Sequence, residues 1–163
     1  MARKKSNKKL YVAYGSNLHL EQMQRRCPDA VVYGFGVIKN HELTFWGNWN
    51  RNGVATVVPN VGTDVPVGLW AISPDDEKNL DIYEGWPHLY RKENIKVVMH
   101  DGSVVTGMIY IMNEGRMRPA SPSEYYYNTI ASGYQSFGFD LSFLQAARNK
   151  ISEPDYRFSR FLE

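Results

Sequence analysis

The chain has 163 residues, of which 43% are hydrophobic and 22% are charged, and its net charge is +2. These values are ordinary for a soluble globular protein, and the length suits one domain with a substantial core. We expect residues 1–8 to form a flexible basic tail and residues 9–163 to form a single domain. The tail holds much of the positive charge, and no basic stretch interleaved with aromatic residues occurs elsewhere. We therefore expect no nucleic-acid partner.

The cysteine and histidine content narrows the class of protein further. The single cysteine, Cys27, excludes an internal disulfide framework, and no apolar secretory segment follows the basic start, so we expect a cytoplasmic protein. No apolar run reaches transmembrane length, and we expect no membrane partner. The four histidines are scattered, and none pairs with another histidine or with cysteine at a metal-ligand spacing. We expect no metal and no cofactor.

The first expected element is an apolar strand over about Lys9–Tyr14. A Gly-Ser-Asn turn follows, in which Asn17 is a good N-cap for a helix that Pro28 ends. Runs of β-branched and aromatic residues then predict several strands in succession. These strands cover Ala30–Ile38, Glu42–Trp46, Val54–Pro59 and Val65–Ile72, with a loop rich in turn formers over Asn48–Gly53.

The segment Ser73-Pro74-Asp75-Asp76 has the features of a sharp helix start. It offers an N-cap serine, a proline at the first helical position and an acid three residues after the cap. This short helix is expected to end around Glu84-Gly85. Farther along the chain, Asp101-Gly102 predicts a hairpin between strands over Tyr90–His100 and Ser103–Met112.

Two helices are expected near the end of the chain. The segment Ser121-Pro122-Ser123-Glu124 repeats the capping pattern and starts a helix that Gly138 can end, and Asp140 caps a last helix. The residues after Ile151 show no clear pattern. Many strands of even length, hairpins and few helices favour an α+β domain with a small closed or curled sheet and helices against it.

The turn Tyr14-Gly15-Ser16-Asn17-Leu18 is the most informative stretch of the sequence. It joins an apolar strand to a helix, so several backbone N–H groups share one small concavity. Such a turn can hold a carboxylate, a phosphate or a polarised carbonyl, and a purely structural glycine turn is the alternative. Ser16 is a poor candidate for a nucleophile, because the sequence places no histidine to serve as its base and the Gly-x-Ser-x-Gly pattern is absent.

Glu84 is the candidate for proton transfer. It lies between Tyr83 and Trp86, at the point where the short helix breaks. Large apolar neighbours can desolvate a carboxyl group, and desolvation raises its pKa toward the range that is useful for proton transfer. Two alternatives stay open: Glu84 is simply exposed near a helix end, or Asp81, in a more polar neighbourhood, takes this role.

Together these motifs resemble the γ-glutamyl cyclotransferase family, from Leu10 to about Leu144. The specific feature is the combination of the Tyr-Gly-Ser-Asn turn with a downstream Glu-Gly. After Gly85 the sequence departs from the better-known vertebrate enzymes, with the bulky insert Trp86-Pro87-His88-Leu89 at the mouth of the expected pocket. The matching motifs are Tyr11-Val-Ala-Tyr-Gly-Ser-Asn-Leu18, Gly53-Val-Ala-Thr-Val57, Val67-Gly-Leu-Trp70, Leu80-Asp-x-x-Glu-Gly85 followed by Tyr90, the strand with Tyr110, and Pro122-Ser123-x-x-Tyr126.

The resemblance implies a curled mixed β-barrel flanked by helices, and a metal-independent enzyme that needs no cofactor. The implied reaction is the lyase-type cyclisation of a small γ-glutamyl compound to 5-oxoproline, with release of a free amine or amino acid. The implied site has a turn that binds the γ-glutamyl group through backbone N–H groups, two pocket tyrosines and a catalytic acid/base. These residues are Tyr14, Gly15, Ser16, Asn17 and Leu18 in the turn, Tyr110 and Tyr126 in the pocket, and Glu84 as the acid/base.

Two rival interpretations remain beside this one. An enzyme of the same fold could act on a different γ-glutamyl compound, such as a γ-glutamyl amine. Alternatively, the chain could be a non-catalytic module that binds a γ-glutamyl group or another carboxylate. The sequence specifies neither the leaving group nor the oligomeric state.

Overall fold

The computed structural model describes residues 8–48, 51–115 and 117–151. Residues 1–7 of the predicted tail and residues 152–163 lie outside this range. The strands are β1 (Lys9–Ala13), β2 (Val31–Asn48), β3 (Arg51–Ile72), β4 (Tyr90–Met99), β5 (Val104–Met112) and β6 (Arg118–Pro119). The helices are α1 (Leu20–Arg26), α2 (Pro74–Glu84), α3 (Glu124–Phe137) and α4 (Leu141–Ile151), with a 3₁₀ turn, η1, at Ser16–Leu18.

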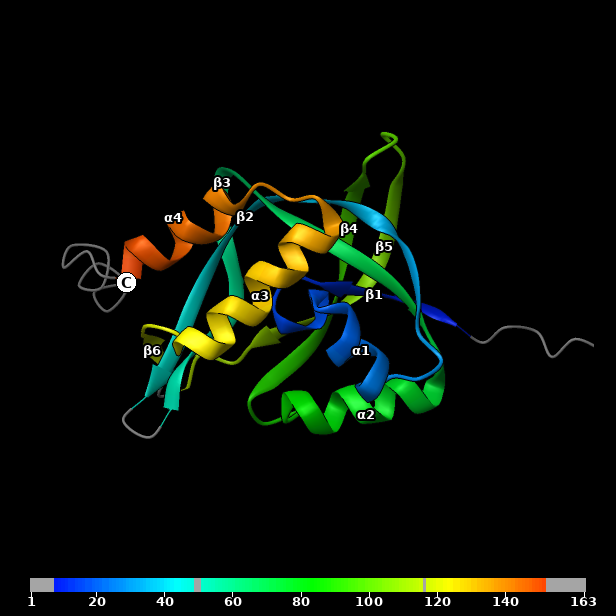
Figure 1. Ribbon diagram of the computed structural model, residues 1–163, viewed down its shortest axis with the longest axis horizontal. Coiled ribbons are helices and arrows are strands. Elements are labelled where there is room, and N and C mark those ends of the chain that lie inside the picture. The colour runs from blue at the N-terminus through cyan, green and yellow to red at the C-terminus, as the bar shows by residue number, and fades with distance from the viewer. Residues whose placement is uncertain (1–7, 49–50, 116, 152–163) are drawn as a thin grey trace, which may run out of the picture.

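Five strands close into a mixed β-barrel flanked by helices (Figure 1). The order around the barrel is β3-β1-β5-β4-β2, and β2 pairs with β3 to close it, while the short β6 adds to the outer part of β2. β1 runs parallel to β5, and the other neighbours are antiparallel. This architecture confirms the curled mixed barrel that the sequence predicts.

β2 and β3 are longer than predicted, because each joins two of the predicted strands. In β2 the register shifts around Asn40, whose φ is 59°, and in β3 a turn around Gly62, whose φ is 92°, stays within the strand. The turn formers that suggested strand ends therefore mark irregularities inside continuous strands. The predicted Asn48–Gly53 loop is shorter as well, since β3 begins at Arg51, and residues 49 and 50 lie outside the described residues.

The ends of α2 and the start of α3 test the capping predictions. The capping box of α2 is confirmed, because Ser73 Oγ accepts a hydrogen bond from the Asp76 N–H at 3.1 Å and the Asp76 carboxylate accepts one from the Ser73 N–H at 3.1 Å. Gly85 ends α2 in the left-handed conformation. α3 starts at Glu124 with Ser123 as its N-cap, so Pro122 precedes the helix rather than opening it.

Asn17 does not cap α1, contrary to the prediction. The residues Ser16–Leu18 form η1 instead, and the N-cap of α1 is His19, whose Nδ1 accepts a hydrogen bond from the Gln22 N–H at 3.2 Å. The short 3₁₀ turn moves the N-cap of the helix two residues along the chain, from Asn17 to His19. It leaves the Asn17 side chain available for contacts with other elements.

η1 is held from two sides. α3 crosses in front of it (Figure 1), and the two pack so closely that a Cβ atom at Gly133 would lie 2.6 Å from the carbonyl carbon of Leu18. From β3, Trp70 Nε1 donates a hydrogen bond to the Asn17 carbonyl at 3.0 Å. Leu18 is fully buried in the core. The turn that the sequence singles out is therefore fixed by the packing of the whole domain.

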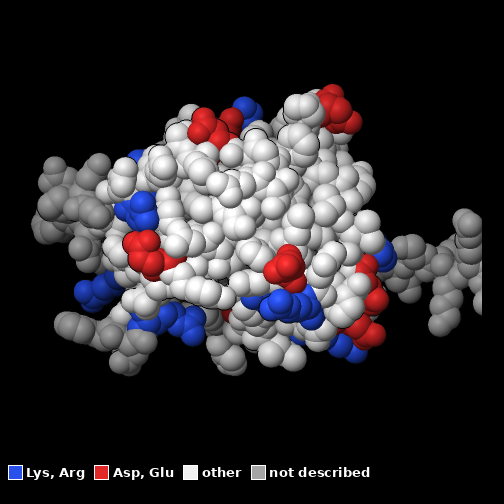
Figure 2. Space-filling view, viewed as in Figure 1, with Lys and Arg blue, Asp and Glu red and all other residues white. Residues whose placement is uncertain are grey.

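Charges of both signs are mixed on the face shown in Figure 2. Lys and Arg side chains lie beside Asp and Glu side chains around the rim, and the centre of the face is largely uncharged. The described part of this face therefore has no extended field of one sign.

Among the residues that the structure describes, no helix is long and apolar enough to cross a membrane.

Candidate active site

A cavity of about 270 Å³ lies between the barrel, η1 and the end of α2. Every site residue predicted from the sequence lines it except Leu18, which lies in the hydrophobic core instead. Asp81, the competing carboxylate, does not line this cavity. The lining residues are Tyr11, Tyr14, Gly15, Ser16, Asn17, Arg51, Val54, Ala55, Tyr83, Glu84, Leu89, Tyr90, Tyr110 and Tyr126.

Glu84 is the last residue of α2, and its side chain is partly buried at the cavity wall. Its Oε1 atom lies 3.4 Å from the amide nitrogen of Asn17. Desolvation by the surrounding protein raises the pKa of Glu84 to about 8, against the positive charge of Arg26, which lowers it. A carboxyl group with such a pKa can both accept and return a proton near neutral pH.

The orientation of the Asn17 amide follows from its partners. Arg26 Nη1 donates a hydrogen bond to Asn17 Oδ1 at 2.5 Å, and a guanidinium can only donate. The Asn17 amide nitrogen must then point the other way, where it donates to the Tyr11 hydroxyl at 2.8 Å and approaches Glu84. Arg26 itself is held against the Tyr83 ring, with its guanidinium carbon 3.5 Å from the ring centre.

Tyrosine hydroxyls bonded to the backbone form much of the cavity wall. The Tyr14 hydroxyl donates to the Tyr110 carbonyl at 2.5 Å, and the Tyr90 hydroxyl donates to the Ala55 carbonyl at 2.6 Å. The Tyr126 hydroxyl accepts from the Ala55 N–H at 3.0 Å. Burial raises the pKa of Tyr14, Tyr90 and Tyr126, so these side chains are neutral at physiological pH. The wall is thus polar at fixed points and carries no charge there.

Gly15 leaves room at the floor of the cavity. A Cβ atom at this position would lie 3.2 Å from Ala55 Cβ and 3.5 Å from the Tyr126 hydroxyl oxygen. The adjacent Ser16 Oγ lies 2.8 Å from the Tyr83 hydroxyl, so its partner is a phenol rather than an imidazole. This arrangement does not support a Ser16 nucleophile, because a phenol does not take the place of the imidazole base that a serine nucleophile needs.

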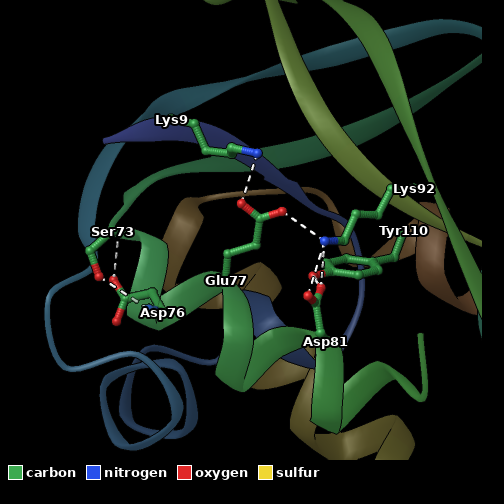
Figure 3. Close-up of polar contacts among 7 residues, drawn as sticks. All are labelled: Lys9, Ser73, Asp76, Glu77, Asp81, Lys92 and Tyr110. Carbon is green, nitrogen blue, oxygen red and sulfur yellow. Dashed lines mark hydrogen bonds and ion pairs between the residues drawn. The ribbon is translucent and has the colours of Figure 1, made fainter. Parts of the chain in front are cut away.

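Asp81 belongs to an ion network between α2 and the strands β1, β4 and β5 (Figure 3). It accepts a hydrogen bond from the Tyr110 hydroxyl at 2.6 Å and pairs with Lys92 at 2.8 Å. Lys92 also pairs with Glu77 at 2.7 Å, and Glu77 pairs with Lys9 at 2.7 Å. Burial lowers the pKa of Lys92, but the hydrogen bonds that Lys92 donates to Asp81 and Glu77 raise it above its ordinary value. The charge of Asp81 is therefore balanced by an ion pair with Lys92, whereas Glu84 faces the uncharged amide of Asn17.

The sequence reasoning did not single out several residues that line or support the cavity, among them Tyr11, Tyr90, Arg26 and Arg51. Tyr11 and Tyr90 lie inside motifs that the sequence analysis quotes, but strand alternation alone does not say which face of a barrel meets a ligand. Arg26 and Arg51 carry no local pattern that would have found them.

Within the described ranges, no group of three or more His, Cys, Asp or Glu side chains is placed to hold a metal ion.

Comparisons with known proteins identify the family of the chain. Residues 11–132 match the family model described as "Gamma-glutamyl cyclotransferase, AIG2-like". A γ-glutamylcyclotransferase of Bos taurus is 31% identical over 157 residues, covering 91% of this chain and 81% of the relative. The Homo sapiens γ-glutamylcyclotransferase is 28% identical over 154 residues, covering 90% of this chain and 80% of the relative.

The fold gives the same assignment. A solved structure named γ-glutamyl cyclotransferase superposes with a TM-score of 0.78 at 26% identity, and the match covers 86% of each chain. A family model that spans most of the chain, a relative above 30% identity and this shared fold all point the same way. The chain belongs to the γ-glutamyl cyclotransferase, AIG2-like family.

Proposed function

We propose that this protein is a cytoplasmic γ-glutamyl cyclotransferase that converts a γ-glutamyl compound to 5-oxoproline and a free amine. Glu84 is the general acid/base in this proposal. The observation that carries it is the position of Glu84, a carboxyl group of raised pKa on the same cavity as the backbone of Gly15, Ser16 and Asn17. Membership of the family, whose relatives are named for this activity, supports the reaction class.

The reaction is intramolecular, and its bonds balance without water. The α-nitrogen of the γ-glutamyl group forms a bond to its own γ-carbonyl carbon, and the bond from that carbon to the leaving nitrogen breaks. Because nucleophile and electrophile belong to one molecule, the protein gains most by holding the substrate in the bent conformation that brings them together. A cavity with walls fixed by backbone-bonded tyrosines suits this task.

Proton transfer is the part assigned to Glu84. The α-amine of a peptide has a pKa of about 8, and the pKa of Glu84 is also about 8. One proton can therefore move between the two groups at little cost in free energy. Glu84 takes this proton from the attacking nitrogen and returns it to the leaving nitrogen.

The turn is assigned the role of stabilising the negative charge that develops on the substrate carbonyl oxygen. As the carbonyl becomes tetrahedral, its oxygen lies against backbone N–H groups of the Tyr14–Asn17 turn, which stabilise the oxyanion. Because α3 and Trp70 fix η1, these donors do not have to reorganise during the reaction. Leu18, in this proposal, supports the turn from the core and does not touch the substrate.

The test is 5-oxoproline release from a panel of γ-glutamyl amino acids, γ-glutamyl amines and glutathione. We expect Glu84→Gln to lower kcat by a factor of about 10² to 10⁴ with little change in KM. The glutamine amide keeps the shape of the side chain but cannot accept and return a proton. The exposed acid Glu93 on β4 provides the matched control, and Glu93→Gln should behave as wild type. Near-normal turnover by Glu84→Gln would remove Glu84 from this role. Binding of γ-glutamyl ligands without any release would indicate the non-catalytic module.

A further inference from the structure

A second hollow of about 440 Å³ adjoins the candidate active site. It shares Arg51, Tyr83 and Leu89 with the first cavity. The rest of its lining comes from the end of α2 and the following turn: Asp81, Ile82, Gly85, Trp86 and His88. We infer that this hollow is the leaving-group subsite, and that it selects an amino acid with a large apolar or aromatic side chain. The inference rests on the proposed cyclotransferase activity and specifies its substrate.

The position of the hollow relative to Glu84 places the leaving group there. Glu84 returns its proton to the leaving nitrogen, so that nitrogen must lie beside the Glu84 carboxylate. Tyr83 and Gly85, the neighbours of Glu84 in the chain, both line the second hollow, and Tyr83 lines the first cavity too. A substrate with its γ-glutamyl end against the Gly15 turn therefore extends its other end past Tyr83 into the hollow.

Apolar side chains dominate the exposed wall of this subsite. Ile82, Tyr83 and Trp86 are 81%, 42% and 42% exposed, although they are among the most hydrophobic residues of this part of the chain. Lys92 Nζ lies 4.1 Å from the centre of the Trp86 ring, a cation–π contact that holds the indole in place. An exposed group of large apolar side chains at the rim of a cavity is typical of a binding surface. A large apolar leaving group would bury these side chains.

The charge of the subsite favours a leaving group with a carboxylate. Arg51 forms no ion pair within the described residues, so its guanidinium is available to a ligand. The carboxylate of Asp81 forms an ion pair with Lys92 and accepts a hydrogen bond from the Tyr110 hydroxyl, so it already has partners. A guanidinium binds a carboxylate with two parallel hydrogen bonds. The α-carboxylate of a leaving amino acid therefore suits this subsite, and a cationic leaving amine does not.

Arg51 lines both cavities, so its partner could instead be the α-carboxylate of the γ-glutamyl group. Two substrates that differ only in the leaving-group carboxylate separate these cases: γ-glutamyl-phenylalanine and γ-glutamyl-phenethylamine. We expect Arg51→Gln to lower kcat/KM for γ-glutamyl-phenylalanine about tenfold or more relative to kcat/KM for γ-glutamyl-phenethylamine. Lys96, an exposed cation on β4, provides the control, and Lys96→Gln should leave this ratio unchanged. An equal loss for both substrates would place Arg51 at the glutamyl end and overturn the carboxylate assignment.

The apolar wall is tested in the same way. Wild type should prefer γ-glutamyl-phenylalanine over γ-glutamyl-glycine, and Trp86→Ala should lower that preference about tenfold or more. Trp86→Phe, which keeps an aromatic ring, should restore most of it, and thermal unfolding of each variant checks that it is folded. Unchanged preference in Trp86→Ala, or wild-type preference for the glycine compound, would overturn the subsite while leaving the cyclotransferase proposal intact. No 5-oxoproline from any γ-glutamyl compound would overturn both proposals.

Discussion

Asn17 links side chains that lie far apart in the sequence. Arg26, from α1, fixes the direction of the Asn17 amide, and that amide faces Glu84 at the end of α2. Arg26 also acts through its charge, because it lowers the pKa of Glu84, which desolvation raises. Arg26 is therefore a positioning residue that affects both the geometry and the proton affinity of the proposed acid/base.

The pH profile should show this influence. The proposed reaction needs one proton shared between Glu84 and the substrate amine, so kcat/KM should be bell-shaped with a maximum near pH ~8. Arg26→Gln removes a cation, which raises the pKa of Glu84 and should move the acidic limb to higher pH, with a lower kcat. Arg26→Lys keeps the charge and should move the limb less.

The buried tyrosines beside Glu84 do not titrate in this range. Burial raises the pKa of Tyr11, Tyr14 and Tyr126, which line the same cavity. A change in the acidic limb therefore reports on Glu84 or on the substrate amine. An acidic limb that is the same in Arg26→Gln and wild type would contradict the role of Arg26.

At the residue scale, the sequence predicts what neighbours in the chain determine. Glu84 stands between Tyr83 and Trp86, and that local fact sufficed to suggest a desolvated carboxyl group. Arg26 could not be found, because its contact with Asn17 depends on η1, which replaces the predicted start of the helix. The burial of the Leu18 side chain was not predictable for a related reason, since a contiguous motif does not reveal which of its side chains point into the core.

Among the elements, the packing of α3 on η1 is the contact that supports the proposed oxyanion site. Gly133 makes the close approach possible, because a Cβ atom there would lie 2.6 Å from the Leu18 carbonyl carbon and Leu18 Cβ. The first of these atoms belongs to the backbone, so no change of rotamer relieves the contact. η1 would have to move away from α3.

We therefore expect Gly133→Ala to destabilise the protein by about 1–3 kcal/mol, although alanine is the better helix former by about 1 kcal/mol. Turnover should fall as well, because the displaced turn carries the proposed oxyanion donors. Urea unfolding and 5-oxoproline release measure the two effects, and Ser132→Ala, an exposed neighbour on α3, is the control. A more stable Gly133→Ala variant would show that propensity outweighs the contact.

The predictability of the elements divides between features set by residues close in sequence and features set by pairing between distant segments. The capping box of α2 and the Asp101-Gly102 hairpin depend on residues close in sequence, and both were predicted correctly. β2 and β3 were each divided in two, because the residues around Asn40 and Gly62 are turn formers by local preference. Pairing between the two long strands outweighs that preference, and such pairing cannot be seen from one segment at a time.

At the scale of the molecule, closure of the barrel assembles the cavity. Its tyrosines come from β1, the turn after it, α2, β4, β5 and α3, and none of these elements forms the wall alone. The sequence pattern predicts a curled sheet, but the order of strands around it depends on pairings between distant segments. The direction of each tyrosine was therefore not predictable before closure was known.

The proton affinity of Glu84 should also appear in the stability of the whole protein. Its pKa is about 8 in the folded state, above the ordinary value of 4.5, so the folded state binds more protons between these values. Its contribution to the free energy of unfolding is therefore complete below about pH 4.5 and is lost as the pH rises to about 8. Glu84→Gln does not titrate and should gain stability relative to wild type over this interval.

The expected gain is on the order of 2–4 kcal/mol, since one pKa unit corresponds to ~1.4 kcal/mol and solvent in the cavity moderates the effect. Denaturant unfolding of both proteins at the two ends of the interval measures it. Glu93→Gln is again the matched control, and its difference from wild type should not vary in this way. A constant difference between Glu84→Gln and wild type would mean that the folded protein leaves the Glu84 pKa unshifted.

The residue at which α2 ends has one more consequence. Asp75, Asp76 and Glu77 lie in the first turn of α2, where the positive end of the helix dipole stabilises their charges. Glu84 lies at the opposite end, where the last carbonyl groups oppose a negative charge. The helix dipole therefore suits the negative charges of the first turn and opposes a negative charge at residue 84. A lysine at position 84 would suit the dipole of α2 better than the glutamate does, but it would leave the site without the proposed acid/base.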